Sequence, residues 1–196
     1  MLKKLSLVAV GAVSAFAMHS AEININNKDL ELSAKMDVGQ FNYNVEPSTM
    51  FIGAKYLNAD EDNSDIDSGI EAYYELNFLM QQEINNSGLS IGMGVKANHT
   101  ENFTSIPLGL EASYALPKST FVPIYVGASI YYAPEVLAME DAKNFLEYRV
   151  SIDIEVIKNG RIIVGARVLD TNYEVNNISK DINYNKSAYM GFKFSF

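Results

Sequence analysis

The sequence predicts an all-β protein: a transmembrane, antiparallel, up-and-down β-barrel of eight to ten strands, with a short helix in one outer loop. Three observations support this fold. Segments of about ten residues alternate between apolar and polar side chains along most of the chain. After residue 17 no apolar run has the length of a transmembrane helix. The chain also finishes on an alternating stretch that ends at the aromatic residue Phe196.

The amino end has the pattern of an export signal. Lys3 and Lys4 precede a short apolar run over 5–16, and Ala15-Phe16-Ala17 fits a small-residue cleavage site. We therefore expect residues 1–17 to be a cleaved signal peptide and 18–196 to be one barrel domain. A membrane-anchor helix is the alternative, but it would need about 20 apolar residues.

Charge and cysteine content limit the partners. The formal net charge is −9, and loss of the two lysines in 1–17 makes it −11 (−9 − 2). Such acidity argues against a nucleic-acid partner, because phosphate binding needs basic patches. The chain has no Cys, which excludes disulfides and thiolate metal sites. We expect no cofactor.

The alternating segments set the strand count. Nine are clear: 30–39, 50–56, 70–80, 89–98, 106–116, 122–132, 146–156, 162–168 and 187–196. Bacterial single-chain barrels have an even number of strands. Counting the weaker segment 22–26 gives ten, which we favour. Eight remains possible if residues 22–39 form a plug or an extended leader.

The connections alternate in length. Short ones at 81–88, 117–120 and 158–160 separate longer ones at 58–67, 98–105, 134–144 and 170–186. Short periplasmic turns and long outer loops have this rhythm in outer-membrane barrels. Pro134 could open a short helix over 134–143, with Val136, Leu137 and Met139 packing against a partner or the barrel mouth. Asn-rich 170–186 is expected to be a loop.

The two faces of the predicted strands differ in chemistry. The apolar face carries no charge, and its aromatic residues lie near strand ends, as in an outer-membrane aromatic belt: Tyr56, Tyr132 and Tyr148 at one end, Phe78, Tyr114, Phe194 and Phe196 at the other. A soluble barrel with an apolar interior would leave these strand ends unexplained. The other face is expected to line the lumen.

That inner face carries charges of both signs. They are Lys35, Asp37, Lys55, Glu71, Glu75, Lys96, Glu111, Glu147, Arg149, Asp153, Glu155, Arg167 and Lys193. In a barrel of eight to ten strands, side chains fill the interior, and opposite charges should pair there. We therefore predict a filled polar lumen stabilised by a charge network. A narrow conduit is the alternative.

Two resemblances add to these predictions. Phe192, Phe194 and Phe196 alternate in a final strand that resembles the C-terminal signature of bacterial outer-membrane proteins. That likeness implies recognition by the outer-membrane assembly machinery, a cell outer-membrane location, and contact with outer-membrane lipid and lipopolysaccharide. The segment 131–138 (Tyr-Tyr-Ala-Pro-Glu-Val-Leu-Ala) and Val164-Gly165-Ala166-Arg167 resemble the YfaZ family of outer-membrane proteins.

The YfaZ resemblance covers most of the mature chain. Segments 37–41 and 51–55 are similar to epsilonproteobacterial members, while Ala166 replaces the aromatic residue usual in the family. The family implies an outer-membrane barrel without an established activity, so no catalytic residue is carried over.

Two loops carry weak signals of a catalytic site and of a metal-binding site. His99, Glu101 and Ser105 are the residue types of outer-membrane hydrolases, but any polar loop contains such residues. Oxygen ligands for Ca²⁺ or Mg²⁺ could come from Asp60, Asp62, Ser64, Asp65, Asp67 and Glu71. Asp65 stands where an EF-hand needs Gly, so a solvated acidic loop is the simpler expectation.

The sequence favours a structural or surface-interaction barrel without enzymatic activity and with an unidentified extracellular partner. A narrow channel for small solutes is the second hypothesis, and a lipid-modifying enzyme the third.

Overall fold

A computed structural model describes residues 19–59, 72–101, 103–117, 122–140, 142–175 and 178–196, and the side chains of all of these except 173–175 and 178–182. No helix in this part of the chain is long and apolar enough to cross a membrane. The predicted signal peptide and the acidic residues Asp60 to Glu71 lie outside the described residues.

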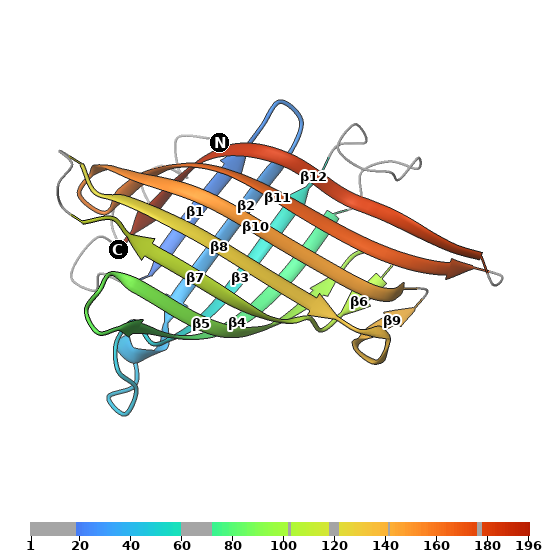
Figure 1. Cartoon of the computed structure of the whole chain (residues 1–196), viewed down its shortest axis with the longest axis horizontal. Helices are drawn as coiled ribbons and strands as arrows, with labels where there is room; N and C mark the ends of the chain where they lie inside the picture. Colours follow the sequence, from blue (N-terminus) through green and yellow to red (C-terminus); the bar gives the residue numbers. More distant parts are fainter. Residues whose placement is uncertain (1–18, 60–71, 102, 118–121, 141, 176–177) are drawn as a thin grey trace, which may run out of the picture.

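Ten long strands form a closed antiparallel barrel (Figure 1). They are β1 (Ser20–Ile25), β2 (Leu30–Asp37), β3 (Met50–Asn58), β4 (Ala72–Ile84), β5 (Leu89–His99), β7 (Leu108–Ala115), β8 (Ile124–Ala133), β10 (Ala142–Ile157), β11 (Gly160–Val175) and β12 (Ile178–Ser195). Two short strands, β6 (Phe103–Ser105) and β9 (Ala138–Glu140), pair with each other beyond the end of β5.

The ring runs β4-β3-β2-β1-β12-β11-β10-β8-β7-β5 and closes where β5 pairs with β4. β1 joins the two ends of the chain because Ser20 to Ile25 pair with Ser195 to Met190. The weak segment 22–26 is therefore a wall strand, and the prediction of ten strands is confirmed.

Tight turns on one rim fix the register of the hairpins. Asn85 and Asn86 both have positive φ (51° and 52°), and the Ser87 N–H donates to the Ile84 carbonyl at 2.9 Å. These are the features of a type I′ turn, whose twist matches that of the flanking strands. Asn159 has a φ of 65° in the turn between β10 and β11. We call this the terminal rim, because His19 and Phe196 lie at the same edge; the opposite edge is the loop rim.

Alternation in the sequence becomes an apolar outer surface. Leu76, Met93 and Met190 are 64%, 69% and 60% exposed, whereas their charged neighbours in the same strands point inward. Exposed aromatic side chains lie towards both rims, including Tyr132, Tyr148, Tyr114 and Phe196. A closed wall with apolar side chains outside and polar ones inside is the arrangement that lipid demands. It excludes the soluble barrel with an apolar interior.

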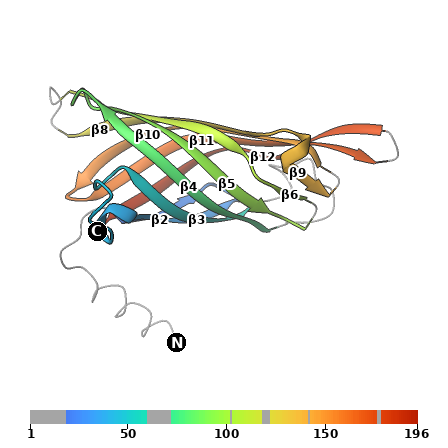
Figure 2. The ribbon, with the colours of Figure 1, turned by 90° about the horizontal axis from the view of Figure 1, so that it is seen from below.

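Two loop predictions were wrong in detail. Residues 170–175 and 178–186 are not an Asn-rich loop: they continue β11 and β12 as paired strands, and the far end of this pair projects beyond the loop rim (Figure 2). Asn and Asp are poor strand formers, but here paired neighbours hold them: Asp170 lies opposite Asn183. The predicted helix over 134–143 is reduced to one 3-10 turn, η4 (Glu135–Leu137), because the chain then enters β9. Val136 is 84% exposed, and only Leu137 of the three proposed packing residues meets the buried cluster described below.

Two glycines, Gly94 and Gly109, leave room for the Tyr131 ring against the inner surface of the barrel wall. A Cβ on Gly109 would lie 2.1 Å from the Ile130 carbonyl oxygen and 2.5 Å from the Tyr131 ring. One on Gly94 would also meet Tyr131, whose phenol donates to Glu111 at 2.7 Å. Tyr131 thereby becomes almost completely buried.

We expect Gly109→Ala to lower the free energy of unfolding by about 1–3 kcal/mol, because overpacking forces strand and ring apart. Gly127→Ala on the neighbouring strand is the matched control, since its Cβ would meet only Ser151 Oγ at 3.2 Å. Urea titration of the barrel folded in lipid vesicles measures both. Equal stability of the two variants would contradict the close packing of Tyr131.

Candidate functional site in the barrel lumen

The lumen is divided into three layers by successive inward positions on each strand. On β4 the inward residues from the loop rim are Tyr73, Glu75, Asn77, Leu79 and Gln81. On β10 they are Phe145, Glu147, Arg149, Ser151 and Asp153. Both strands begin with an aromatic residue, which a carboxylate follows, and the positions beyond are of mixed chemistry. The lumen is therefore apolar at one end, ionic in the middle, and open with polar and apolar lining at the other.

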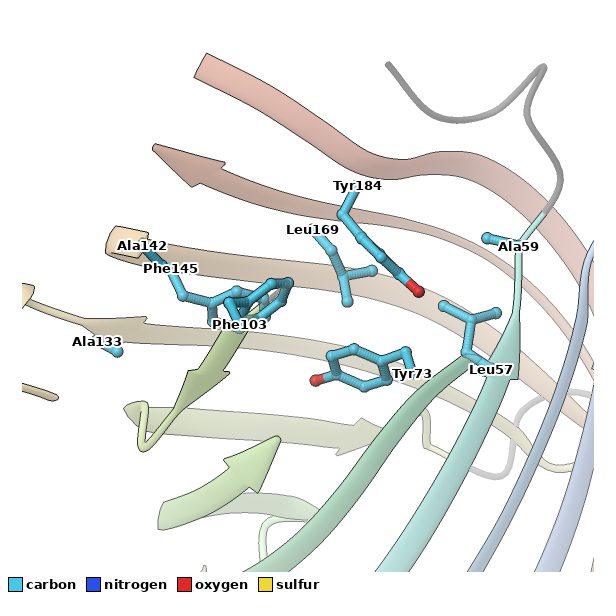
Figure 3. Packing of buried hydrophobic residues seen from close by; sticks show 9 residues of the cluster. All are labelled: Leu57, Ala59, Tyr73, Phe103, Ala133, Ala142, Phe145, Leu169 and Tyr184. Carbon is cyan, nitrogen blue, oxygen red and sulfur yellow. The ribbon is translucent and has the colours of Figure 1, made fainter. Parts of the chain in front are cut away.

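The apolar plug fills the loop-rim end (Figure 3). Its nine residues are buried to 5% exposure or less: Leu57, Ala59, Tyr73, Phe103, Ala133, Ala142, Phe145, Leu169 and Tyr184. Ring centroids of Phe103 lie 5.6 Å from Phe145 and 6.0 Å from Tyr184, and Tyr73 lies 5.9 Å from Tyr184. Such pairs add about 0.5–1.5 kcal/mol each to the gain from burial.

Below the plug, four charges form a neutral square. Lys55 Nζ lies 2.8 Å from Glu75 and 3.0 Å from Glu147, and Lys96 Nζ lies 2.6 Å from Glu147 and 3.3 Å from Glu75. All four side chains are at most 8% exposed. The Tyr73 hydroxyl and Asn77 Nδ2 also donate to Glu75, at 2.9 and 3.0 Å.

A second neutral group of four lies beside the square. Arg149 donates two hydrogen bonds to Glu31, at 2.8 and 2.5 Å. Arg167 donates to Glu31 at 3.3 Å and to Asp29 at 3.0 Å, and its Nε donates to Asn185 at 2.7 Å. Buried ions are tolerated only with such complete pairing. We call these eight residues the charge layer: Asp29, Glu31, Lys55, Glu75, Lys96, Glu147, Arg149 and Arg167.

Ion pairs of the charge layer connect strands on opposite sides of the barrel. β3, which carries Lys55, and β10, which carries Glu147, are five places apart in the ring of ten. Arg149 on β10 reaches Glu31 on β2 in the same way. The side chains therefore cross the bore, and both the plug and the charge layer obstruct it.

The terminal-rim half contains a cavity of about 480 Å³, which we call the vestibule. Its floor is formed by charge-layer residues such as Lys55 and Lys96, and Ser20, Asn159 and Ser195 line it at the terminal rim. The Lys35–Glu111 ion pair (3.3 Å) is about one-third exposed, and Lys193 pairs with Glu22 at 3.4 Å. The sequence had led us to expect a polar and filled lumen. The described residues instead form an apolar plug at one end and a cavity at the other.

The predicted lumen charges have different environments. Nine of them form the inward ion pairs given above: Lys35, Lys55, Glu75, Lys96, Glu111, Glu147, Arg149, Arg167 and Lys193. Asp37 instead accepts the backbone N–H groups of Gly39 (2.9 Å) and Ser48 (2.7 Å) at the 3-10 turn η2 (Val38–Gln40). Glu155 accepts from the Tyr125 hydroxyl at 3.2 Å, and Asp153 from Ser151 at 2.9 Å. Glu71 lies outside the described residues.

Several important lumen residues were not among the predicted sites. Glu31 had the inward parity of β2 and could have been found from alternation alone. Asp29 stands in the expected turn before that strand, and Phe103 in an expected polar loop, so periodicity carried no signal for them.

The weak candidates for catalysis are not assembled. Ser105 points inward, is fully buried and donates to Asn98 Oδ1, whereas His99 and Glu101 are exposed. His99 Nδ1 instead lies 2.8 Å from Thr104 Oγ1, which donates to Glu140 at 3.3 Å. Within the described residues, no three His, Asp or Glu side chains are grouped to hold a metal ion. The proposed ligands Asp60, Asp62, Asp65 and Asp67 lie outside them.

Comparisons with known proteins give the family. No curated protein matches the chain. Two solved structures are similar in fold, "KdgM porin" and "KdgM porin in complex with disordered oligogalacturonate". Each is 10% identical, covers 91% of this chain and 98% of its own, and has a TM-score of 0.46. The family model described as "YfaZ precursor" matches residues 2–196. The chain belongs to the YfaZ family.

Proposed function

We propose that the protein is a sealed outer-membrane β-barrel that does not conduct and that acts as a structural or surface-interaction element, without enzymatic activity. The observation that carries this proposal is the double obstruction of the lumen by the apolar plug and the charge layer. A solute would have to displace aromatic side chains and separate buried ion pairs, and isolating a buried charge costs several kcal/mol. The family match, which is to a precursor, agrees with export through a cleaved signal peptide.

A narrow channel for small solutes is the second candidate, and the vestibule favours it. About 480 Å³ of the terminal-rim half is already open, so only the plug and the charge layer would have to move. Conduction would then require a second arrangement of these layers.

Conductance in planar bilayers separates the two functions. We expect the purified wild-type barrel to give no steady openings, because both layers obstruct the bore. The variant Phe145→Ser/Lys55→Ser/Glu147→Ser should conduct, since it shortens the plug and removes one neutral cross-lumen pair. A heat-induced shift in electrophoretic mobility shows that the variant has folded. Steady openings by the folded wild type would overturn the sealed barrel and support the channel.

A further inference from the structure

Two charges that face the vestibule, Asp153 and Arg161, form no ion pair with any described residue. Asp153 on β10 is 8% exposed, and its carboxylate accepts a hydrogen bond only from Ser151 Oγ (2.9 Å) among the described residues. No described Lys or Arg side chain forms an ion pair with it. A buried carboxylate without a cation is costly unless something else compensates its charge.

The second of these charges is Arg161 on β11. Its guanidinium carbon lies 3.6 Å from the centroid of the Tyr125 ring, a close cation–π contact. No described carboxylate lies within ion-pair distance of it. Glu155, its cross-strand neighbour, accepts instead from the Tyr125 hydroxyl at 3.2 Å. The guanidinium N–H groups of Arg161 thus have no acceptor among the described residues.

Both charges lie near the same aromatic ring. Asp153 lies directly opposite Tyr125 in the register of β10 and β8, and Arg161 lies over the ring from β11. All three residues line the vestibule, as do the hydroxyl-bearing residues Ser129 and Ser151. Elsewhere on the vestibule wall Lys35 and Lys193 have carboxylate partners. Asp153 stands on the strand between those of Tyr125 and Arg161, so an acceptor for a cation and a donor to an anion lie near one apolar ring.

We propose that the vestibule binds a small zwitterionic solute carrying one ammonium and one carboxylate group. The ammonium would meet Asp153, the carboxylate would receive hydrogen bonds from Arg161, and the intervening carbons would lie against Tyr125. Arg–carboxylate pairs are among the strongest polar contacts, and 480 Å³ is within the usual range for small-molecule pockets. This inference does not depend on whether the loop rim is sealed.

Fluorescence titration with matched probes tests the proposal. The chain contains no Trp, so Phe51→Trp places a single indole in the vestibule wall. The probes are 4-aminobutyrate, butyrate and butylammonium, which share one carbon skeleton and differ only in the charged ends. We expect 4-aminobutyrate to bind at least about tenfold more tightly than either singly charged probe.

Substitutions of Asp153 and Arg161 test which residue binds the ammonium and which the carboxylate of 4-aminobutyrate. In the Phe51→Trp background, Asp153→Asn should reduce 4-aminobutyrate affinity to about that of butyrate, and Arg161→Gln to about that of butylammonium. Glu101→Gln, a matched charge loss on the exposed loop rim, should leave the affinity unchanged. Equal affinity for all three probes, no binding of 4-aminobutyrate at millimolar concentration, or retention of its advantage in both vestibule variants would overturn the proposal.

Discussion

Replacement of Glu147 by alanine is expected to lower the free energy of unfolding by about 3–5 kcal/mol. Glu147 accepts hydrogen bonds from both Lys55 and Lys96, at 3.0 and 2.6 Å, and all three side chains are at most 8% exposed. Its loss leaves two ammonium groups facing the single carboxylate of Glu75. The excess charge remains in a layer from which water is largely excluded.

Urea unfolding in lipid vesicles, followed by the heat-dependent mobility shift, measures the Glu147→Ala effect. Lys35→Ala is the control, because the Lys35–Glu111 bridge is partly exposed, such bridges contribute about 0–1 kcal/mol, and Glu111 keeps its hydrogen bond from Tyr131. The double variant Lys55→Met/Glu147→Leu should recover part of the loss, since it removes a cation together with the anion. A Glu147→Ala barrel as stable as the Lys35→Ala barrel would show that the charge layer does not stabilise the fold.

Phe196→Ser is expected to reduce the amount of folded barrel in the outer membrane several-fold. The backbone of Phe196 pairs with His19 in both directions, at 2.9 and 2.8 Å, and its ring lies 6.0 Å from the His19 ring and 6.3 Å from that of Phe194. Serine can keep the backbone pair but loses the aromatic contacts at the terminal rim. It also removes the residue that we propose the assembly machinery recognises.

Membrane fractionation with the heat-dependent mobility shift reports the Phe196→Ser result. Phe41→Ser is a close control, because Phe41 stacks on the same His19 ring (5.1 Å) but lies outside the wall strands. Normal insertion of Phe196→Ser would remove the role in assembly given to Phe192, Phe194 and Phe196. An equal defect in both variants would assign the effect to the aromatic cluster rather than to the strand.

The wall of the barrel was largely predictable because each strand obeys one rule. A residue facing lipid must be apolar and its neighbour must not, so period-two alternation sets the face of nearly every wall residue. Even the weak segment around Ile23 could be counted, because bacterial single-chain barrels have an even number of strands. Alternation failed for 170–175 and 178–186, because polar residues such as Asp170 and Asn183 pair there and the end of the strand pair projects beyond its neighbours, where no lipid imposes a pattern.

The layering of the lumen was not predictable in the same way. Periodicity says that Lys55, Glu75 and Glu147 face inward, but not that they meet, because contacts across the bore depend on strand order and shear. The plug was hidden for a second reason: Phe103 comes from a polar segment, and Leu57 and Leu169 break the expectation that inward residues are polar. The sequence also gives no measure of unfilled volume, so the vestibule had no signature.

The seam between β1 and β12 bears on the timing of membrane insertion. Ser20 pairs with Ser195, 175 positions further along the chain (195 − 20). Contacts between such distant segments are slow to form, because the chain between them loses entropy when its ends are brought together. Until β12 meets β1, each carries a row of unsatisfied hydrogen-bonding groups that hydrocarbon cannot accommodate. The nascent sheet must therefore be sheltered until its opposite edges meet, and any agent that engages β12 first would govern when the cylinder becomes compatible with lipid.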